Sequence, residues 1–123
     1  MKKVYREQDM YEYVHRNLRR RYPQHEGWEI YAQDDWVTYR PDFVVERSSE
    51  DGIVERVICE VKAESRIAQR HISQINDYAR RLAGRNVRIR QKILAIPYGV
   101  PFDHVPDDID VMVLRTFGYE DNY

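Results

Sequence analysis

Several features of exported and membrane proteins are scarce or absent in this sequence of 123 residues. Cys59 is its single cysteine, so no disulfide can form within the chain. No stretch approaches the roughly 18 apolar residues of a membrane span, and the first residues contain no apolar run typical of a signal peptide. We therefore expect a protein of a reducing, cytoplasmic location, not bound to a membrane.

An excess of charge of one sign is also missing. The chain has 20 Lys and Arg against 21 Asp and Glu, a formal net charge of −1. Net charge therefore gives no overall argument for binding to nucleic acid or to membranes. The charges are unevenly placed, because "RNLRRRYP" from Arg16 and "RNVRIRQK" from Arg85 are basic, while "VPDDID" from Val105 is acidic. Taken alone, such runs are most often solvated faces.

Internal repeats, low-complexity tracts and linkers are absent as well. The hydrophobic fraction is 42% and the charged fraction 33%, which is ordinary for a soluble globular protein. The length suffices to bury one respectable core. The sequence therefore predicts a single domain over residues 1–123.

Hydrophobic spacing predicts two helices. The first runs from about Tyr5 to Tyr22 and ends before Pro23 and Gly27. The second follows Glu64-Ser65 and runs over 66–82, and Gly84 is its expected C-cap. The apolar positions that define the two helices are Met10, Tyr11, Val14, Leu18 and Tyr22 in the first, and Ala68, Ile72, Ile75, Ala79 and Leu82 in the second.

Five other segments are typical of strands. They are "WEIYA" (28–32), "DFVVE" (42–46), "IVERVICEVKA" (53–63), "VRIRQKILAIP" (87–97) and "VPDDIDVMVLRTF" (105–117). Asp51-Gly52 predicts a tight hairpin between the second and third. The fourth becomes continuously apolar, which suits a central strand covered on both faces. The order αβββαββ predicts an α/β fold, with a central mixed sheet flanked by helices.

The third predicted strand contains two charges in its most apolar part. Because side chains alternate along a strand, Ile58, Glu60 and Lys62 share one face. Charges partly removed from water are unfavourable unless they are paired, hydrogen-bonded or bound to a metal. A plain ion pair on an edge strand is one explanation of Glu60 and Lys62.

Asp42 favours another explanation. It follows Pro41 where the preceding strand starts, and the hairpin brings this strand alongside 57–62. Two carboxylates can then converge beside Lys62, and a divalent cation would relieve their repulsion. Mg²⁺ accepts one or two carboxylates together with water and phosphate. A lysine can orient or help deprotonate an attacking water, so these groups suit phosphodiester hydrolysis.

Pro41-Asp42 followed by Glu60-Val61-Lys62 across a hairpin resembles the PD-(D/E)XK nuclease superfamily, which has the restriction-endonuclease-like fold. The resemblance extends from the first helix to the last strand. It implies that Asp42, Glu60 and the backbone carbonyl of Val61 bind Mg²⁺, for which Mn²⁺ can substitute. It also implies that Lys62 is catalytic.

The second helix adds a further match. "QINDY" gives Gln74 and Tyr78 in the Gln-x-x-x-Tyr arrangement that several branches of the superfamily share, including RecB-type nucleases. Helical geometry places His71, Gln74 and Tyr78 together along one border of the apolar stripe. Gln74 could hydrogen-bond the water, a metal ligand or a phosphate, and Tyr78 is a candidate for contact with nucleic acid. A histidine at this border is more often structural, or a phosphate contact, than a metal ligand.

The superfamily often adds an acid from the first helix. Glu7 lies seven residues before Val14, on the apolar side, whereas Glu12 lies on the opposite side. Glu7 is therefore the candidate for a further metal ligand. If the helix starts after it, however, Glu7 would only favour the helix N-terminus.

Candidate phosphate contacts are local clusters of basic side chains. Such contacts position a duplex and carry little sequence information. The candidates are Arg66 and Arg70 on the second helix, Arg88, Arg90 and Lys92 on one face of a strand, and Arg16, Arg19, Arg20 and Arg21 on the first helix.

A minimal domain of this kind resembles archaeal Holliday-junction resolvases and Mrr-like proteins. This resemblance implies a homodimer that acts on DNA, with RNA less favoured, in a structure-selective or non-specific way. Two alternatives stay open. One is a catalytically silent nucleic-acid-binding module that keeps the fold. The other is an interaction protein in which Glu60 and Lys62 form an ordinary ion pair.

Overall fold

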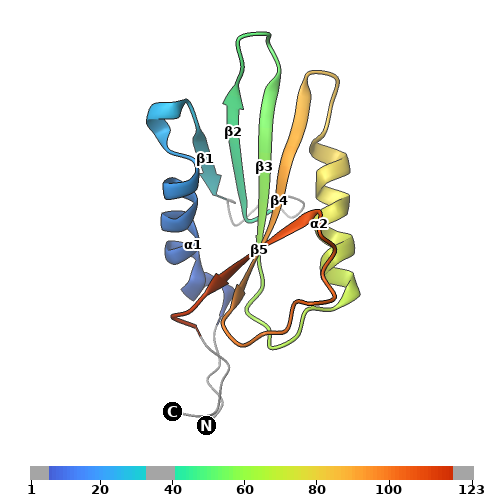
Figure 1. Cartoon of the computed structure of the whole chain (residues 1–123). Coiled ribbons are helices and arrows are strands. Elements are labelled where there is room, and N and C mark those ends of the chain that lie inside the picture. Colours follow the sequence, from blue (N-terminus) through green and yellow to red (C-terminus); the bar gives the residue numbers. More distant parts are fainter. Residues whose placement is uncertain (1–5, 33–40, 118–123) are drawn as a thin grey trace.

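The computed structural model describes residues 6–32 and 41–117 of the chain (Figure 1). Apart from a short 3₁₀ helix, its elements follow the predicted order αβββαββ, and the predicted start of the first helix at Tyr5 lies outside the described residues. In chain order the elements are α1 (Glu7–Arg21), η1 (Gln24–Glu26), β1 (Glu29–Ala32), β2 (Phe43–Ser48), β3 (Val54–Val61), α2 (Gln69–Leu82), β4 (Val87–Pro97) and β5 (Ile109–Leu114).

The five strands form one mixed sheet in the order β1-β2-β3-β4-β5. β1, β2 and β3 pair antiparallel, whereas β3-β4 and β4-β5 pair parallel. The predicted hairpin joins β2 to β3, and Gly52 supplies the positive φ of 81° that its turn requires. The Ser49 N–H closes this turn by donating to the Ile53 carbonyl at 2.8 Å. The predicted α/β class and mixed sheet are therefore confirmed.

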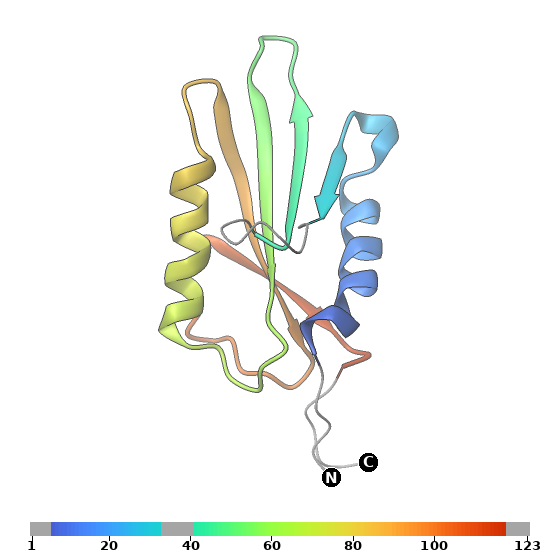
Figure 2. The same cartoon turned by 180° about the vertical axis from the view of Figure 1, so that it is seen from behind.

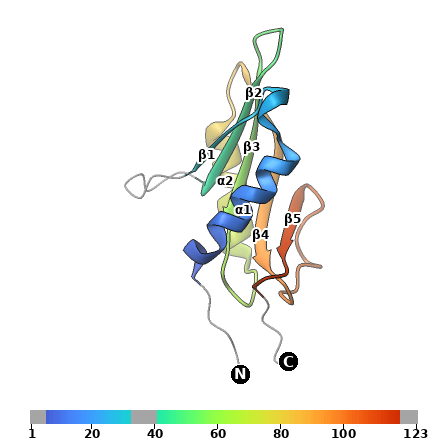
Figure 3. The ribbon, with the colours of Figure 1, turned by 90° about the vertical axis from the view of Figure 1, so that its left-hand side faces the viewer.

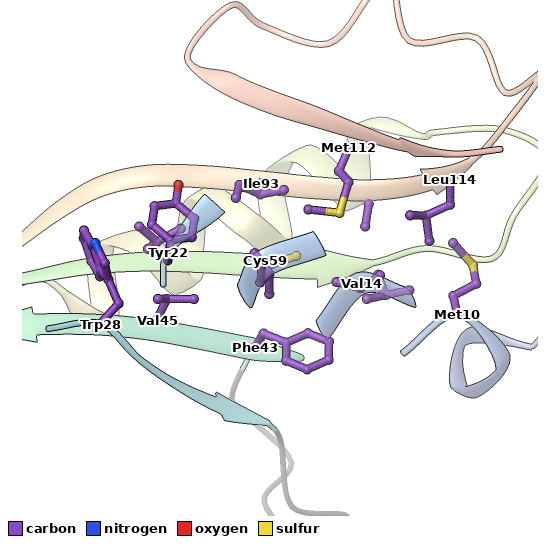
Figure 4. Close-up of a cluster of buried hydrophobic side chains, with 14 of the residues drawn as sticks. Met10, Val14, Tyr22, Trp28, Phe43, Val45, Cys59, Ile93, Met112 and Leu114 are labelled. Carbon is purple, nitrogen blue, oxygen red and sulfur yellow. The ribbon is translucent and has the colours of Figure 1, made fainter. Parts of the chain in front are cut away.

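The two helices cover opposite faces of the sheet. In Figure 1 α1 and α2 flank the strands, and the turned views of Figures 2 and 3 place them on opposite sides. Alternate residues of β3 follow this division: Val57, Cys59 and Val61 join the cluster beneath α1, and Ile58 joins the cluster beneath α2. Figure 4 shows side chains of α1 meeting those of β2, β3, β4 and β5 in the first cluster. The predicted alternation of faces along β3 is therefore confirmed.

The predicted C-cap at Gly84 is wrong. α2 ends at Leu82, and Ala83 leaves it in an extended conformation with φ −74° and ψ 151°. Among the described glycines, only Gly27, Gly52 and Gly99 have a positive φ. Because the chain turns away one residue earlier, Gly84 instead forms an isolated antiparallel bridge with Val87. α2 also begins at Gln69, three residues later than predicted.

The prediction that the basic side chains of β4 share one face is wrong, because β4 contains a β-bulge. Arg56 of β3 lies opposite Ile89 and Val57 lies opposite Gln91, so Arg90 is an extra residue. Arg90 consequently lies over Trp28 on the α1 side of the sheet, while the Lys92 ammonium donates to Asn76 of α2. Arg88, Arg90 and Lys92 therefore do not share one face.

Neither α-helix in the described ranges is long and apolar enough to cross a membrane. α1 carries buried Met10, Val14 and Leu18 along one stripe only, and α2 likewise buries a single side. Both are amphipathic helices that cover a sheet.

Candidate active site

Asp42 and Glu60 meet at the end of the β2-β3 ladder farthest from the hairpin turn. Phe43 lies opposite Cys59, so Asp42, the residue before β2, lies alongside Glu60 of β3. The Asp42 N–H donates to Glu60 Oε1 at 3.0 Å, and the Val61 N–H donates to Asp42 Oδ2 at 2.7 Å. The side chains are buried, with residue exposures of 5% for Asp42 and 4% for Glu60. The two strands thus hold two carboxyl groups together at a position that is almost inaccessible to solvent.

The electrostatics of this pair are unfavourable. The pKa of Glu60 is raised to about 8, mainly by burial and secondly by the charge of Asp42. The Lys62 ammonium and the hydrogen bond from the Asp42 N–H lower this pKa but do not outweigh the two other effects. A carboxyl with so high a pKa is held where a second negative charge is disfavoured. The protein therefore contains a buried place that would gain stability from an added positive charge.

Lys62 supplies one positive charge but not a close pair. Its Nζ lies 3.6 Å from Glu60 Oε2, and the side chain is only 11% exposed. The same ammonium donates to Gln74 Oε1 at 2.8 Å. The Lys62 N–H continues the ladder beyond β3 by donating to the Ala95 carbonyl at 2.9 Å, which fixes the backbone from which the side chain extends. One ammonium thus faces two carboxylates.

The Gln-x-x-x-Tyr pair of α2 continues the hydrogen bonds from Lys62. Gln74 Nε2 donates to the Tyr78 hydroxyl at 3.3 Å, one helical turn further along. Tyr78 is buried, and burial followed by the charge of Glu60 raises its pKa. The structure therefore brings Gln74 and Tyr78 to the site, where they connect α2 to the Lys62 ammonium.

His71, predicted as a nucleic-acid contact, is 4% exposed and engaged within the protein. Its Nδ1 accepts the Ala68 N–H at 2.9 Å, and its Nε2 lies 2.9 Å from Glu64 Oε2. Burial lowers its pKa, against the opposing effect of Glu64. These contacts fix the start of α2, and a phosphate could reach His71 only by displacing one of them.

The structure also separates the two glutamates of α1, Glu7 and Glu12. Glu7 is the first residue of this helix and is half-buried. Burial raises the pKa of Glu7, and the next influences are Lys62, which lowers it, and Asp42, which raises it. Glu12 instead faces solvent and pairs with Arg16 at 3.1 Å. Glu7 is thus the acid of α1 that borders the site.

Tyr11 is a site residue that sequence reasoning missed. Its hydroxyl donates to Asp42 Oδ1 at 2.5 Å, and its ring packs edge-on against Phe43 at 5.6 Å between centroids. Burial and the bond to Asp42 raise its pKa. Tyr11 follows Glu7 by one helical turn on the same side of α1, but this spacing alone does not indicate a bond to Asp42.

The predicted phosphate contacts lie at separate places. Arg66 and Arg70 are exposed and line a depression with Glu64, whose Oε2 lies 3.6 Å from Arg70 Nη2. Of the predicted contacts on β4, Arg90 and Lys92 are bonded to acids or amides of the protein. Arg90 donates to Glu55 at 2.8 Å, and Lys92 donates to Asp108 at 2.5 Å and to Asn76 at 2.9 Å, while Arg88 is exposed beside Glu55.

Within residues 6–32 and 41–117, no group of three or more His, Cys, Asp or Glu is arranged to hold a metal ion. The available donor set is the two carboxylates of Asp42 and Glu60. Such a set suits Mg²⁺, which completes its octahedron with water and phosphate, and does not suit a closed zinc site.

Comparison with known proteins finds no matching family model, no similar curated protein and no similar solved structure. The function of this chain is therefore inferred from its side-chain chemistry.

Proposed function

We propose that this chain is a metal-dependent nuclease that hydrolyses phosphodiester bonds in DNA. One observation carries the proposal: Asp42 and Glu60 converge in a buried place with Lys62 as their only close ammonium among the described residues. The resemblance to the PD-(D/E)XK superfamily and its restriction-endonuclease-like fold supports it, because the same three residues carry the superfamily's motif.

Asp42 and Glu60 would hold the cation, and the Val61 backbone carbonyl between Glu60 and Lys62 is a further oxygen ligand that the resemblance implies. Glu7 borders them and is the candidate for an additional carboxylate. When bound, Mg²⁺ or Mn²⁺ supplies positive charge that neutralises a developing charge on a phosphoryl oxygen. The raised pKa of Glu60 supports this assignment, because a cation would offset the repulsion that raises it.

Lys62 would act on the attacking water. Its ammonium can donate a hydrogen bond to that water or to a phosphoryl oxygen, and it lies at the same end of the strands as the carboxylates. Gln74 holds the ammonium at 2.8 Å and is in turn bonded to Tyr78. A restrained ammonium loses less entropy when it meets its substrate, so α2 contributes by positioning the lysine.

The substrate would be recognised through its backbone. Arg66 and Arg70 follow the Lys62 strand in the chain and are exposed, so they can contact backbone phosphates. Phosphate contacts carry little sequence information, which favours structure-selective or non-specific cleavage. The analogy with Holliday-junction resolvases and Mrr-like proteins adds a homodimer with two sites.

A cleavage assay tests this function. Purified protein would be incubated with Mg²⁺ or Mn²⁺ and supercoiled plasmid, linear duplex, single strand, RNA or a four-way junction. We expect DNA cleavage that stops in EDTA and fails with Ca²⁺, whose looser coordination supports binding without chemistry. Undiminished cleavage in EDTA would contradict the metal-dependent mechanism.

One observation favours a second candidate, a catalytically silent nucleic-acid-binding module. Both Asp42 oxygens accept hydrogen bonds within the protein, and the Lys62 ammonium is bonded to Gln74. A site satisfied in this way could keep the fold without chemistry. Salt-sensitive binding of DNA without cleavage under any of the metal conditions above would favour this candidate.

A further inference from the structure

Tyr11 joins α1 to the Asp42 carboxylate through a short hydrogen bond. The hydroxyl donates to Oδ1 at 2.5 Å, across 31 positions of the chain. The phenol O–H is the donor and the Asp42 carboxylate oxygen is the acceptor. The contact is therefore a charge-assisted bond between a neutral donor and a carboxylate.

The other Asp42 oxygen is fixed from the opposite side. Oδ2 accepts the Val61 N–H at 2.7 Å, so one bond from α1 and one from β3 together define the plane of the carboxylate. Each oxygen retains one further lone pair, because a carboxylate oxygen can accept two hydrogen bonds or bind a cation. The two bonds thus leave Asp42 with a defined direction for a ligand.

The Tyr11 ring is itself held in place. It packs edge-on against Phe43 at 5.6 Å, with 71° between the ring planes, and Phe43 directly follows Asp42 in the chain. Phe43 is 2% exposed, so this contact joins Tyr11 to the core beneath α1. The ring and the hydroxyl therefore hold two successive residues of the chain, and the hydroxyl has little freedom to leave Oδ1.

We propose that Tyr11 is a positioning residue for the divalent cation, and that its bond to Asp42 makes the site prefer Mg²⁺ over Ca²⁺. This inference rests on the proposed function. Mg²⁺ demands a nearly ideal octahedron, whereas Ca²⁺ accepts irregular geometry and variable coordination. A carboxylate that is held in one orientation favours the stricter ion, and a carboxylate that can rotate loses that advantage. Partners that orient a metal ligand typically change metal affinity about 10- to 100-fold.

Cation binding in the absence of nucleic acid tests the inference. Calorimetric titration would give the affinities of the wild type, Tyr11→Phe and Tyr13→Phe for Mg²⁺ and for Ca²⁺ at one pH. Tyr13 is the matched control, because its ring packs on Phe117. We expect Tyr11→Phe to weaken Mg²⁺ binding about 10- to 100-fold and Ca²⁺ binding less, which lowers the ratio of the two affinities. Tyr13→Phe should leave this ratio unchanged.

A second variant separates positioning from packing. Phe43→Leu removes the ring contact and keeps the Tyr11 hydroxyl, so it should lower the melting temperature but reduce the preference for Mg²⁺ less than Tyr11→Phe does. If Tyr11→Phe weakens the binding of both ions equally, or of neither, the inference is wrong while the proposed function stands. If the wild type binds neither ion, the proposed function and the inference fail together.

Discussion

The two ends of the β2-β3 hairpin carry charge in different ways. Near the turn, Arg56 Nη2 lies 2.7 Å from Glu46 Oε1, and Arg47 Nη2 lies 2.9 Å from Glu55 Oε2. These side chains are partly exposed, and each carboxylate has a guanidinium. Such pairs contribute little to stability individually, but they leave no charge uncompensated.

The other end of the hairpin lacks this balance. Asp42 and Glu60 are buried together, and the Lys62 Nζ is 3.6 Å from the nearer oxygen of Glu60. The pKa of Glu60 rises to about 8 there, whereas two arginine hydrogen bonds lower the pKa of Glu55 near the turn. Two buried carboxyl groups that share one ammonium oppose folding at any pH where both are ionised, so their presence is better explained by function than by stability. The same pair of strands thus carries a balanced surface end and an unbalanced buried end.

The largest predicted effect is the loss of DNA cleavage when Lys62 is removed from the buried end of the hairpin. Lys62→Ala should reduce DNA cleavage about 10²- to 10⁴-fold, because the group assigned to the attacking water is lost. DNA binding measured in Ca²⁺ should persist. Gel-based cleavage rates and binding isotherms would check both expectations.

Two control variants show whether the loss of cleavage is specific to Lys62. Gln74→Ala removes the hydrogen-bond partner of the ammonium and keeps Lys62 itself, so it should reduce cleavage less than Lys62→Ala does. Arg56→Ala changes a cation of the other end and should leave cleavage close to the wild-type rate. A Lys62→Ala protein that cuts like the wild type would make Lys62 an ordinary ion-pair partner.

A smaller difference should appear in the pH dependence of stability. Folded Glu60 keeps its proton to about pH 8, whereas a glutamic acid in the unfolded chain loses it near its ordinary pKa of 4.5. Between these values the folded protein binds more protons, so the metal-free stability should fall as pH rises. Glu60→Gln should remove this part of the slope in thermal melts from pH 5 to pH 8.

The control for the pH experiment comes from the turn end. The pKa of Glu55 is lowered by Arg47 and Arg90, so its linkage to stability operates below its ordinary value of 4.5. Glu55→Gln should therefore leave the slope between pH 5 and pH 8 as in the wild type. Equal slopes for the wild type and Glu60→Gln would show that Glu60 titrates normally.

The smallest predicted effect is the coupling energy between Glu46 and Arg56, near the hairpin turn. A double-mutant cycle with Glu46→Gln and Arg56→Gln should give a coupling of about 1 kcal/mol or less in chemical denaturation, because both side chains remain partly hydrated. Arg56 also donates to the Leu82 carbonyl at 2.6 Å, so its single variant should be destabilised more than the pair coupling alone predicts. A coupling of several kcal/mol would remove the contrast between the two ends.

The parts of the fold that local sequence determines were predicted correctly. Asp51-Gly52 predicted the β2-β3 hairpin, and the positive φ of Gly52 is the physical basis of that signal. The hairpin then brought Asp42 opposite Glu60, because antiparallel register follows from the turn. Alternation along β3 predicted which side chains meet each helix.

Features that depend on distant contacts were missed. No local pattern marks Tyr11 as the partner of Asp42, since the bond joins α1 to the start of β2. The bulge at Arg90 depends on how β4 pairs with β3, and it moves one basic side chain to the opposite face. Gly84 was a reasonable C-cap by composition, but the bridge to Val87 draws the chain into an extended path first.

The central claim is that Asp42 and Glu60 form a two-carboxylate cation site, and melting curves of the wild type and Asp42→Asn with and without Mg²⁺ test it most directly. An asparagine can accept the Val61 N–H with its oxygen and donate to the Tyr11 hydroxyl with its amide, so the fold should tolerate it. We expect metal-free Asp42→Asn to be as stable as the wild type or more stable by about 1 kcal/mol, and inactive in cleavage. Mg²⁺ should raise the wild-type melting temperature and raise that of the variant less. Equal responses of the two proteins to Mg²⁺ would contradict the two-carboxylate site.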